Sequence, residues 1–378
     1  MVERMGMVVW HLRRRVVWAA IVLSVSLTAA SQSPCDFTPA ESHFAHLNIQ
    51  ANYQWFEDQF SPPHTSTSTG NLVLDSTEIY DSAASGYQLD GNSRVAFGPT
   101  GLGLSLTGSG NLKNYLQGDT FAIGAVSVRY ALAGGLEGEL TGGLGRGRFR
   151  DVTPLAKAIR IQNRFLDEGI LLGPMADELL KALAQSIGAV GPSSNDLLAT
   201  IESEIEATGL VQGGTLGAHA LSEIEGILAS TEEARLCGWD VQVRAGLAAS
   251  TVPQPKLSEA LALSWDYAVV PDPVSQWQAS ADWVSGLSLF DRYSFEASIS
   301  YGRRIGDTWR IRASYDFSRD LLWNTAHAMP FDHHLASATF ISQLSAQLSV
   351  TLNLELEYET GYEQPTKTLT LHLSYDVL

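Results

Sequence analysis

Histidine and carboxylate side chains cluster in one segment of the second half of the chain, where they could bind a metal ion. The cluster consists of His327, Asp332, His333 and His334. Imidazole nitrogens and carboxylate oxygens are ligands of zinc and other transition metals. The spacing of these residues matches no diagnostic ligand pattern. The sequence therefore predicts no metal site and no cofactor.

Glycines before a helical segment could cradle a phosphate group, and they are Gly142, Gly143, Gly145 and Gly147. The full G-x-G-x-x-G pattern fails, because Arg148 stands where the last glycine belongs. No serine and histidine occur in the context that nucleophilic catalysis needs. We therefore expect that the protein is not an enzyme.

Six basic residues lie close together in an acidic chain, and they are Arg146, Arg148, Arg150, Lys157, Arg160 and Arg164. The formal net charge of −17 argues against a nucleic-acid partner. The basic run could contact anionic lipid headgroups or a periplasmic protein. Salt bridges to acidic residues of the following helices are the alternative that we favour. Those acidic residues are Asp167, Glu168, Glu202, Glu204 and Glu206.

Long segments alternate between apolar and polar residues and would place many charges on one face. Between residues 348 and 358, six apolar residues alternate with five polar ones. Side chains of a transmembrane β-strand face lipid and lumen in turn. Six charged residues are therefore predicted to face a water-filled lumen, and they are Glu137, Glu139, Arg310, Arg312, Glu355 and Glu357.

A soluble β-sandwich would also produce alternation, but two features favour a membrane barrel. The apolar rows extend over five or six positions, which is long for soluble strands. Aromatic residues such as Trp265, Tyr267 and Tyr358 gather near predicted strand ends, where bilayer interfaces would lie. We predict an all-β transmembrane barrel of about 14 antiparallel strands, with 12 as the competing count. Strands occupy residues 31–151 and 237–378.

Residues 152–236 break this pattern and read as an inserted α-helical domain. Thr153 is expected to cap the first helix, with Pro154 at its first position and Gly169 after its end. The insert follows the sixth predicted strand. With a periplasmic N-terminus, it would lie on the periplasmic side, as would Cys35 and Cys237. A disulfide between these two cysteines and a pair of free thiols are both compatible with the sequence.

Residues 1–30 are typical of a secretory signal peptide. Arg13, Arg14 and Arg15 precede an apolar stretch, and Thr28-Ala29-Ala30 offers a cleavage site. An uncleaved anchor is the alternative, but the apolar stretch is short for a membrane span.

The C-terminal residues Leu369–Leu378 resemble the final strand of bacterial outer-membrane β-barrel proteins, with Tyr375 near the end and Leu378 in place of a terminal aromatic residue. The resemblance implies an outer-membrane location, lipid contact and insertion by the barrel-assembly machinery. A barrel of this width is not filled by its own side chains. We expect a porin-like passive pore or small-solute transporter, whose acidic lumen favours cations. The alternative is a structural or assembly barrel whose helical insert docks a periplasmic protein.

Overall fold

The computed structural model describes residues 34–376, except positions 40, 58–65, 99–100, 133–134, 190–194, 231–233, 252–254, 287–291, 307, 323–329, 345–347 and 362–363. The predicted signal peptide and His327 lie outside the described residues.

Fourteen strands close into a barrel within the described part of the chain. They are β1 (Glu41–Glu57), β2 (Ser66–Ser82), β3 (Ser85–Gly98), β4 (Gly101–Gln117), β5 (Thr120–Ala131), β6 (Gly135–Asp151), β7 (Leu236–Ser250), β8 (Lys256–Asp272), β9 (Ser275–Ser285), β10 (Arg292–Ile305), β11 (Trp309–Leu322), β12 (Pro330–Gln343), β13 (Leu348–Glu359) and β14 (Thr366–Asp376).

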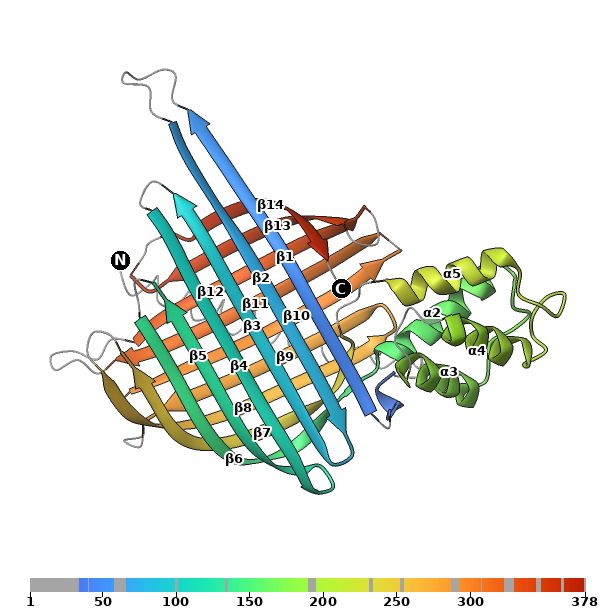
Figure 1. Cartoon of the computed structure of the whole chain (residues 1–378), viewed down its shortest axis with the longest axis horizontal. Helices are drawn as coiled ribbons and strands as arrows, with labels where there is room; N and C mark the ends of the chain where they lie inside the picture. Colours follow the sequence, from blue (N-terminus) through green and yellow to red (C-terminus); the bar gives the residue numbers. More distant parts are fainter. Residues whose placement is uncertain are drawn as a thin grey trace, which may run out of the picture. The chain divides into compact units, whose positions relative to one another are not determined.

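Each strand pairs antiparallel with its neighbours in sequence order, and β1 pairs with β14 to close the sheet (Figure 1). The predicted barrel of about fourteen strands is confirmed.

The outward face of the barrel carries exposed aliphatic side chains at every second position of its strands. In β6, Leu140 is 67% exposed, whereas Thr141, on the opposite face, is 4% exposed. The same outward rows are found around the barrel at Leu102, Leu106, Leu112, Leu144, Val243, Leu247, Leu263, Leu354, Leu356, Leu369, Leu371 and Leu373. Aliphatic side chains gain nothing from water, so this surface fits the hydrocarbon of a bilayer.

Four helices lie between β6 and β7 and gather at one end of the barrel (Figure 1). They are α2 (Thr153–Asp167), α3 (Asp177–Ala189), α4 (Asn195–Glu206) and α5 (Ala218–Ala229). Ile161, Phe165, Leu183, Ile201 and Ile224 are fully buried among them. We call this end of the barrel the helix end and the opposite end the loop end. Among the described residues, no helix combines the length and hydrophobicity of a membrane span.

The start of α2 differs from the sequence-based expectation. Val152 occupies the N-cap, and Thr153 is the first helical residue. Asp151 accepts hydrogen bonds from both the backbone N–H and the hydroxyl of Thr153, while the Thr153 hydroxyl oxygen accepts one from the Arg235 N–H. The threonine therefore joins the two chain segments that leave and re-enter the barrel. Its hydroxyl is engaged there, and it makes no capping bond to the helix.

The segment before β1 is tied to the opposite wall of the barrel. Cys35, in the short 3₁₀ helix η1 (Pro34–Asp36), forms a disulfide with Cys237 near the start of β7. Phe37 is buried beside Val152 and Val270 in the core of the helical domain. From Cys35 to Glu41 the chain can reach only about 21 Å. Six strand spacings along the rim from β7 to β1 would need about 29 Å. The connection is therefore too short to follow the rim.

We expect that Cys35→Ser/Cys237→Ser weakens the attachment of this segment, because the bond closes a loop with a sequence separation of 202 residues. For a loop of this length, chain-entropy arguments give about 5 kcal/mol of stabilisation. The variant should lose helical circular dichroism at a lower temperature than the oxidised parent. Reductant should produce the same change in the parent and none in the variant. Equal melting temperatures with and without reductant would contradict the expectation.

Lys157 in α2 is a partly buried cation, and its Nζ donates a hydrogen bond to the Leu228 carbonyl oxygen at 2.8 Å. Burial lowers the pKa of Lys157 to about 8 from its ordinary 10.5, and nearby Arg160 and Arg304 act in the same direction, against Asp151. At a pH between these two values, Lys157 is protonated in the unfolded chain and largely neutral in the folded one. The free energy of unfolding should therefore rise with pH in this range.

Raising the pH from 7 to 10 should therefore stabilise the parent relative to Lys157→Met, by at most about 3 kcal/mol. Thermal unfolding of both proteins across this pH range measures the difference. A gain of the same size in the methionine variant would show that other groups cause it.

Candidate functional site

A cavity of about 540 Å³ lies inside the barrel between β2–β4 and β7–β10. We call it the chamber. Four carboxylates and two basic side chains line it, and they are Asp81, Asp240, Asp266, Asp282, Lys113 and Arg244. Serine, glutamine and asparagine side chains fill much of the remaining wall. The chamber is thus a polar compartment with an excess of negative charge.

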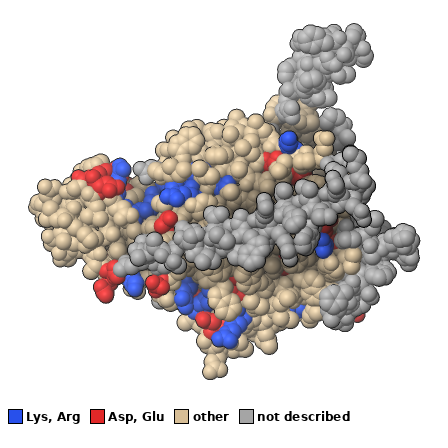
Figure 2. Space-filling view, turned by 180° about the vertical axis from the view of Figure 1, so that it is seen from behind, with Lys and Arg blue, Asp and Glu red and all other residues tan. Residues whose placement is uncertain are grey.

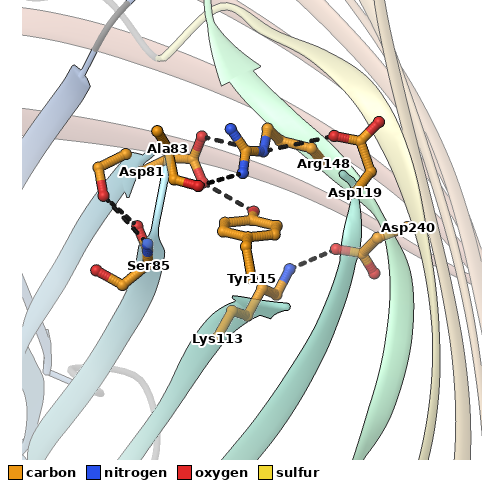
Figure 3. Close-up of polar contacts among 9 residues, drawn as sticks. Asp81, Ala83, Ser85, Lys113, Tyr115, Asp119, Arg148 and Asp240 are labelled. Carbon is orange, nitrogen blue, oxygen red and sulfur yellow. Dashed lines mark hydrogen bonds and ion pairs between the residues drawn. The ribbon is translucent and has the colours of Figure 1, made fainter. Parts of the chain in front are cut away.

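Lys113 of β4 reaches across two intervening strands to form an ion pair with Asp240 of β7 (Figure 3). Its Nζ lies 4.9 Å from the centre of the Phe121 ring of β5. Asp240 is buried and also accepts a hydrogen bond from the Gln242 amide at 2.8 Å. The ion pair is therefore supported by a second polar partner and by an aromatic face.

Glycines on the inward face of β6 make this crossing contact sterically accessible. Gly145 pairs with Phe121 on one side and with Gln242 on the other. A Cβ at Gly145 would lie 2.4 Å from the Phe121 ring and 2.8 Å from the Val241 carbonyl oxygen. The glycine run that could have cradled a phosphate therefore has a packing role in a strand.

Two carboxylates of the chamber, Asp266 of β8 and Asp282 of β9, have no basic partner. The strand register pairs Asp266 with Ser280 and Ser264 with Asp282, so the two carboxylates are diagonal neighbours on one face. Within the described part of the chain, neither makes a hydrogen bond or an ion pair. Arg244, the nearest basic residue by register, donates to the Ser264 hydroxyl at 3.0 Å. These carboxylates are available to a cation in the chamber.

At the helix end, Arg148 of β6 contacts the last residues of β2, the last residues of β4 and the turn between β4 and β5 (Figure 3). Its guanidinium carbon lies 3.7 Å from the centre of the Tyr115 ring. Its Nε lies 3.8 Å from carboxylate oxygens of Asp81 and of Asp119. The Tyr115 hydroxyl donates to Asp81 at 2.8 Å. Arg148 therefore has a structural role, because its partners all lie within the chain.

The six residues of the basic run divide between β6 and α2. Lys157 bonds to Leu228, and Arg164 forms ion pairs with Glu168 at 2.7 Å and Glu223 at 3.0 Å. Arg146 is exposed, and Arg150 is half-buried. Among the described residues on the face drawn in Figure 2, charged side chains form separate small patches surrounded by uncharged residues. Contacts within the chain thus account for Arg148, Lys157 and Arg164.

The six charged residues predicted to face the lumen alternate with exposed apolar residues along their strands. The charged and the apolar side chains therefore lie on opposite faces of the sheet. Glu137 and Glu139 alternate with Leu136 and Leu140 in β6. Arg310 and Arg312 line a smaller cavity of about 50 Å³ at the helix end, together with Arg235 and Arg304.

In β13, Glu355 and Glu357 alternate with exposed Leu354 and Leu356 near the loop end. The Asn353 amide donates to Glu355 at 2.6 Å. Of these six residues, the arginines of β11 therefore lie near the helix end, and the glutamates of β6 and β13 lie toward the loop end.

The chamber residues Lys113, Asp266 and Asp282 were not singled out by sequence reasoning. Alternation places each of them on the polar face of its strand, and this was the available signal. Their grouping depends on the register between strands and on closure of the sheet. Neither can be read from the pattern of a single strand.

No protein-family model matches the chain, and no curated protein matches its sequence. Among solved structures, it is similar to a loop-deletion mutant of OmpT, an outer membrane protein of Vibrio cholerae, at 8% identity and a TM-score of 0.33. That match covers 89% of this chain and 99% of the other.

A BenF-like porin from Pseudomonas fluorescens Pf-5 matches at 6% identity and a TM-score of 0.33, over 90% and 99% of the two chains. Pseudomonas aeruginosa OccK2 in complex with glucuronate matches at 8% identity and a TM-score of 0.34. That match covers 90% of this chain and 100% of the other. The closed antiparallel sheet and its aliphatic outer face by themselves give the chain the fold of an outer-membrane β-barrel.

Substitution of Gly145 tests the close packing beneath the Lys113–Asp240 pair. We expect Gly145→Ala to reduce stability by about 1–3 kcal/mol, because its Cβ would overlap the Phe121 ring and a β7 carbonyl oxygen. Gly124→Ala is the matched control, since a Cβ there meets nothing within 4 Å. Urea unfolding of both variants in detergent gives the comparison. Equal midpoints for the two variants would contradict the packing argument.

Proposed function

We propose that this protein is a passive pore of the bacterial outer membrane that conducts small solutes and prefers cations. The observation that carries the proposal is the chamber, where Asp266 and Asp282 have no basic partner and carboxylates outnumber basic side chains. Carboxylates that line a water-filled path attract cations and repel anions. Glu355 and Glu357 extend the negative face toward the loop end.

Two features support the membrane location. The outer face of the barrel is aliphatic, and closure of the sheet leaves no backbone group unpaired toward lipid. The C-terminal strand, β14, supports insertion by the barrel-assembly machinery as part of the same proposal. The arginines near the helix end would lower cation occupancy there, so the preference should be moderate. The chamber, with its excess of carboxylates, should then determine selectivity.

Reversal potentials in planar bilayers under a KCl gradient test the proposal. The parent should show stepwise conductance with a permeability ratio for K⁺ over Cl⁻ above one. Asp266→Asn/Asp282→Asn should move this ratio toward one without lowering the folded yield, because it removes two negative charges from the chamber.

Glu202→Gln/Glu225→Gln removes the same charge from the helical domain and should leave the ratio unchanged. Absence of any conductance in the parent would refute the pore. Equal ratios in the parent and the aspartate variant would refute the assigned selectivity.

A further inference from the structure

Near the loop end, three side chains from β12 and β13 bring metal-ligating atoms together on the inward face of the barrel. His333, Glu357 and Glu359 each offer one such atom, and the three atoms lie within 4.8 Å of one another. His333 Nε2 lies 2.7 Å from a Glu357 carboxylate oxygen. The register pairs His333 with Glu359 directly, so all three residues share one face.

The surroundings of this group are negatively charged. On β12, β13 and β14, the inward positions of the described residues include Glu355, Glu357 and Glu359 but no lysine or arginine. Lys367 pairs with exposed Leu356 and therefore lies on the outward face. Within the described part of the chain, Glu359 makes no hydrogen bond or ion pair.

The neighbouring basic residue is engaged elsewhere. Arg319 forms two hydrogen bonds with Asp332, at 2.7 and 2.8 Å. Asp332 shares its face with His334, which packs against Tyr315, Phe317 and Tyr358 on the outward side. Of the three described residues that the sequence grouped as potential ligands, Asp332, His333 and His334, only His333 therefore joins the inward carboxylates.

We propose that His333, Glu357 and Glu359 bind a divalent transition-metal cation in the outer part of the lumen. One imidazole nitrogen and two carboxylate oxygens form a donor set that suits Zn²⁺ and Co²⁺. Mg²⁺ and Ca²⁺ prefer oxygen-only sites, so the imidazole discriminates against them. The three ligands leave coordination positions for water, and a cation here would be exchangeable with the lumen.

A second group of potential ligands in the helical domain provides an internal comparison. Glu168, His219 and Glu223 also bring their atoms within 4.8 Å. The Arg164 guanidinium lies 2.7 Å from Glu168 and 3.0 Å from Glu223, so a cation already occupies the space between these carboxylates. We therefore place the metal site in the barrel rather than in the helical domain.

Metal binding to the mature protein, purified in detergent without a histidine tag, tests the proposal. Titration calorimetry with Zn²⁺ should show one dominant site, and Co²⁺ should develop a visible absorption band. His333→Gln and Glu357→Gln should each weaken binding at least about tenfold, since loss of even an outer-shell partner has that effect. A large excess of Mg²⁺ should not displace the metal.

His43→Gln is the matched control, because His43 contacts the carboxylate of Glu78 at 3.0 Å and no third potential ligand joins them among the described residues. It should bind Zn²⁺ as the parent does, and His219→Gln should do the same. Loss of binding in His219→Gln but not in His333→Gln would overturn the proposal, as would absence of Zn²⁺ binding or equal displacement by Mg²⁺. The binding measurement needs no open pore, so its failure is distinguishable from failure of the proposed conductance.

Discussion

The pairing of β1 with β14 is the interaction on which the rest of the structure depends. An open sheet would present unpaired N–H and C=O groups to hydrocarbon, where each unpaired group costs several kcal/mol. In the described register, Asn48, Ile49 and Gln50 pair with Asp376, Tyr375 and Ser374. This seam joins residues more than three hundred positions apart. The lumen, the chamber and the inward charges have defined positions only once it has formed.

Closure also explains why small residues are needed on the inward face. Side chains from opposite walls compete for the same interior, and β6 resolves this by presenting glycines where Phe121 and Lys113 pass over it. The ion pair between Lys113 and Asp240 leaves Asp266 and Asp282 without a basic partner. The glycines of β6 thus allow a chamber that is tightly packed on one side and negatively charged on the other.

Much of the fold could be predicted from the sequence because strand alternation has a period of two. The apolar rows indicated which side chains face outward, and the break after Asp151 indicated the helices. Contacts between distant strands could not be predicted, because a shift of register by one residue exchanges the two faces. The expected cap at Thr153 was wrong for a local reason: Asp151, two residues earlier, takes the hydroxyl for its own hydrogen bond. The grouping of His333 with Glu359 likewise depends on the register of β12 with β13.

The disulfide divides the molecule into two mechanically different halves. The bond joins the segment before β1 to the start of β7, so the first six strands and all four helices lie within one covalent ring. The strands from β8 to β14 lie outside this ring. Hydrogen bonds along β7–β8 and along the seam attach their two edges to the rest of the barrel. Under pulling force or heat, the second half would separate as a sheet while the ring limits extension of the first.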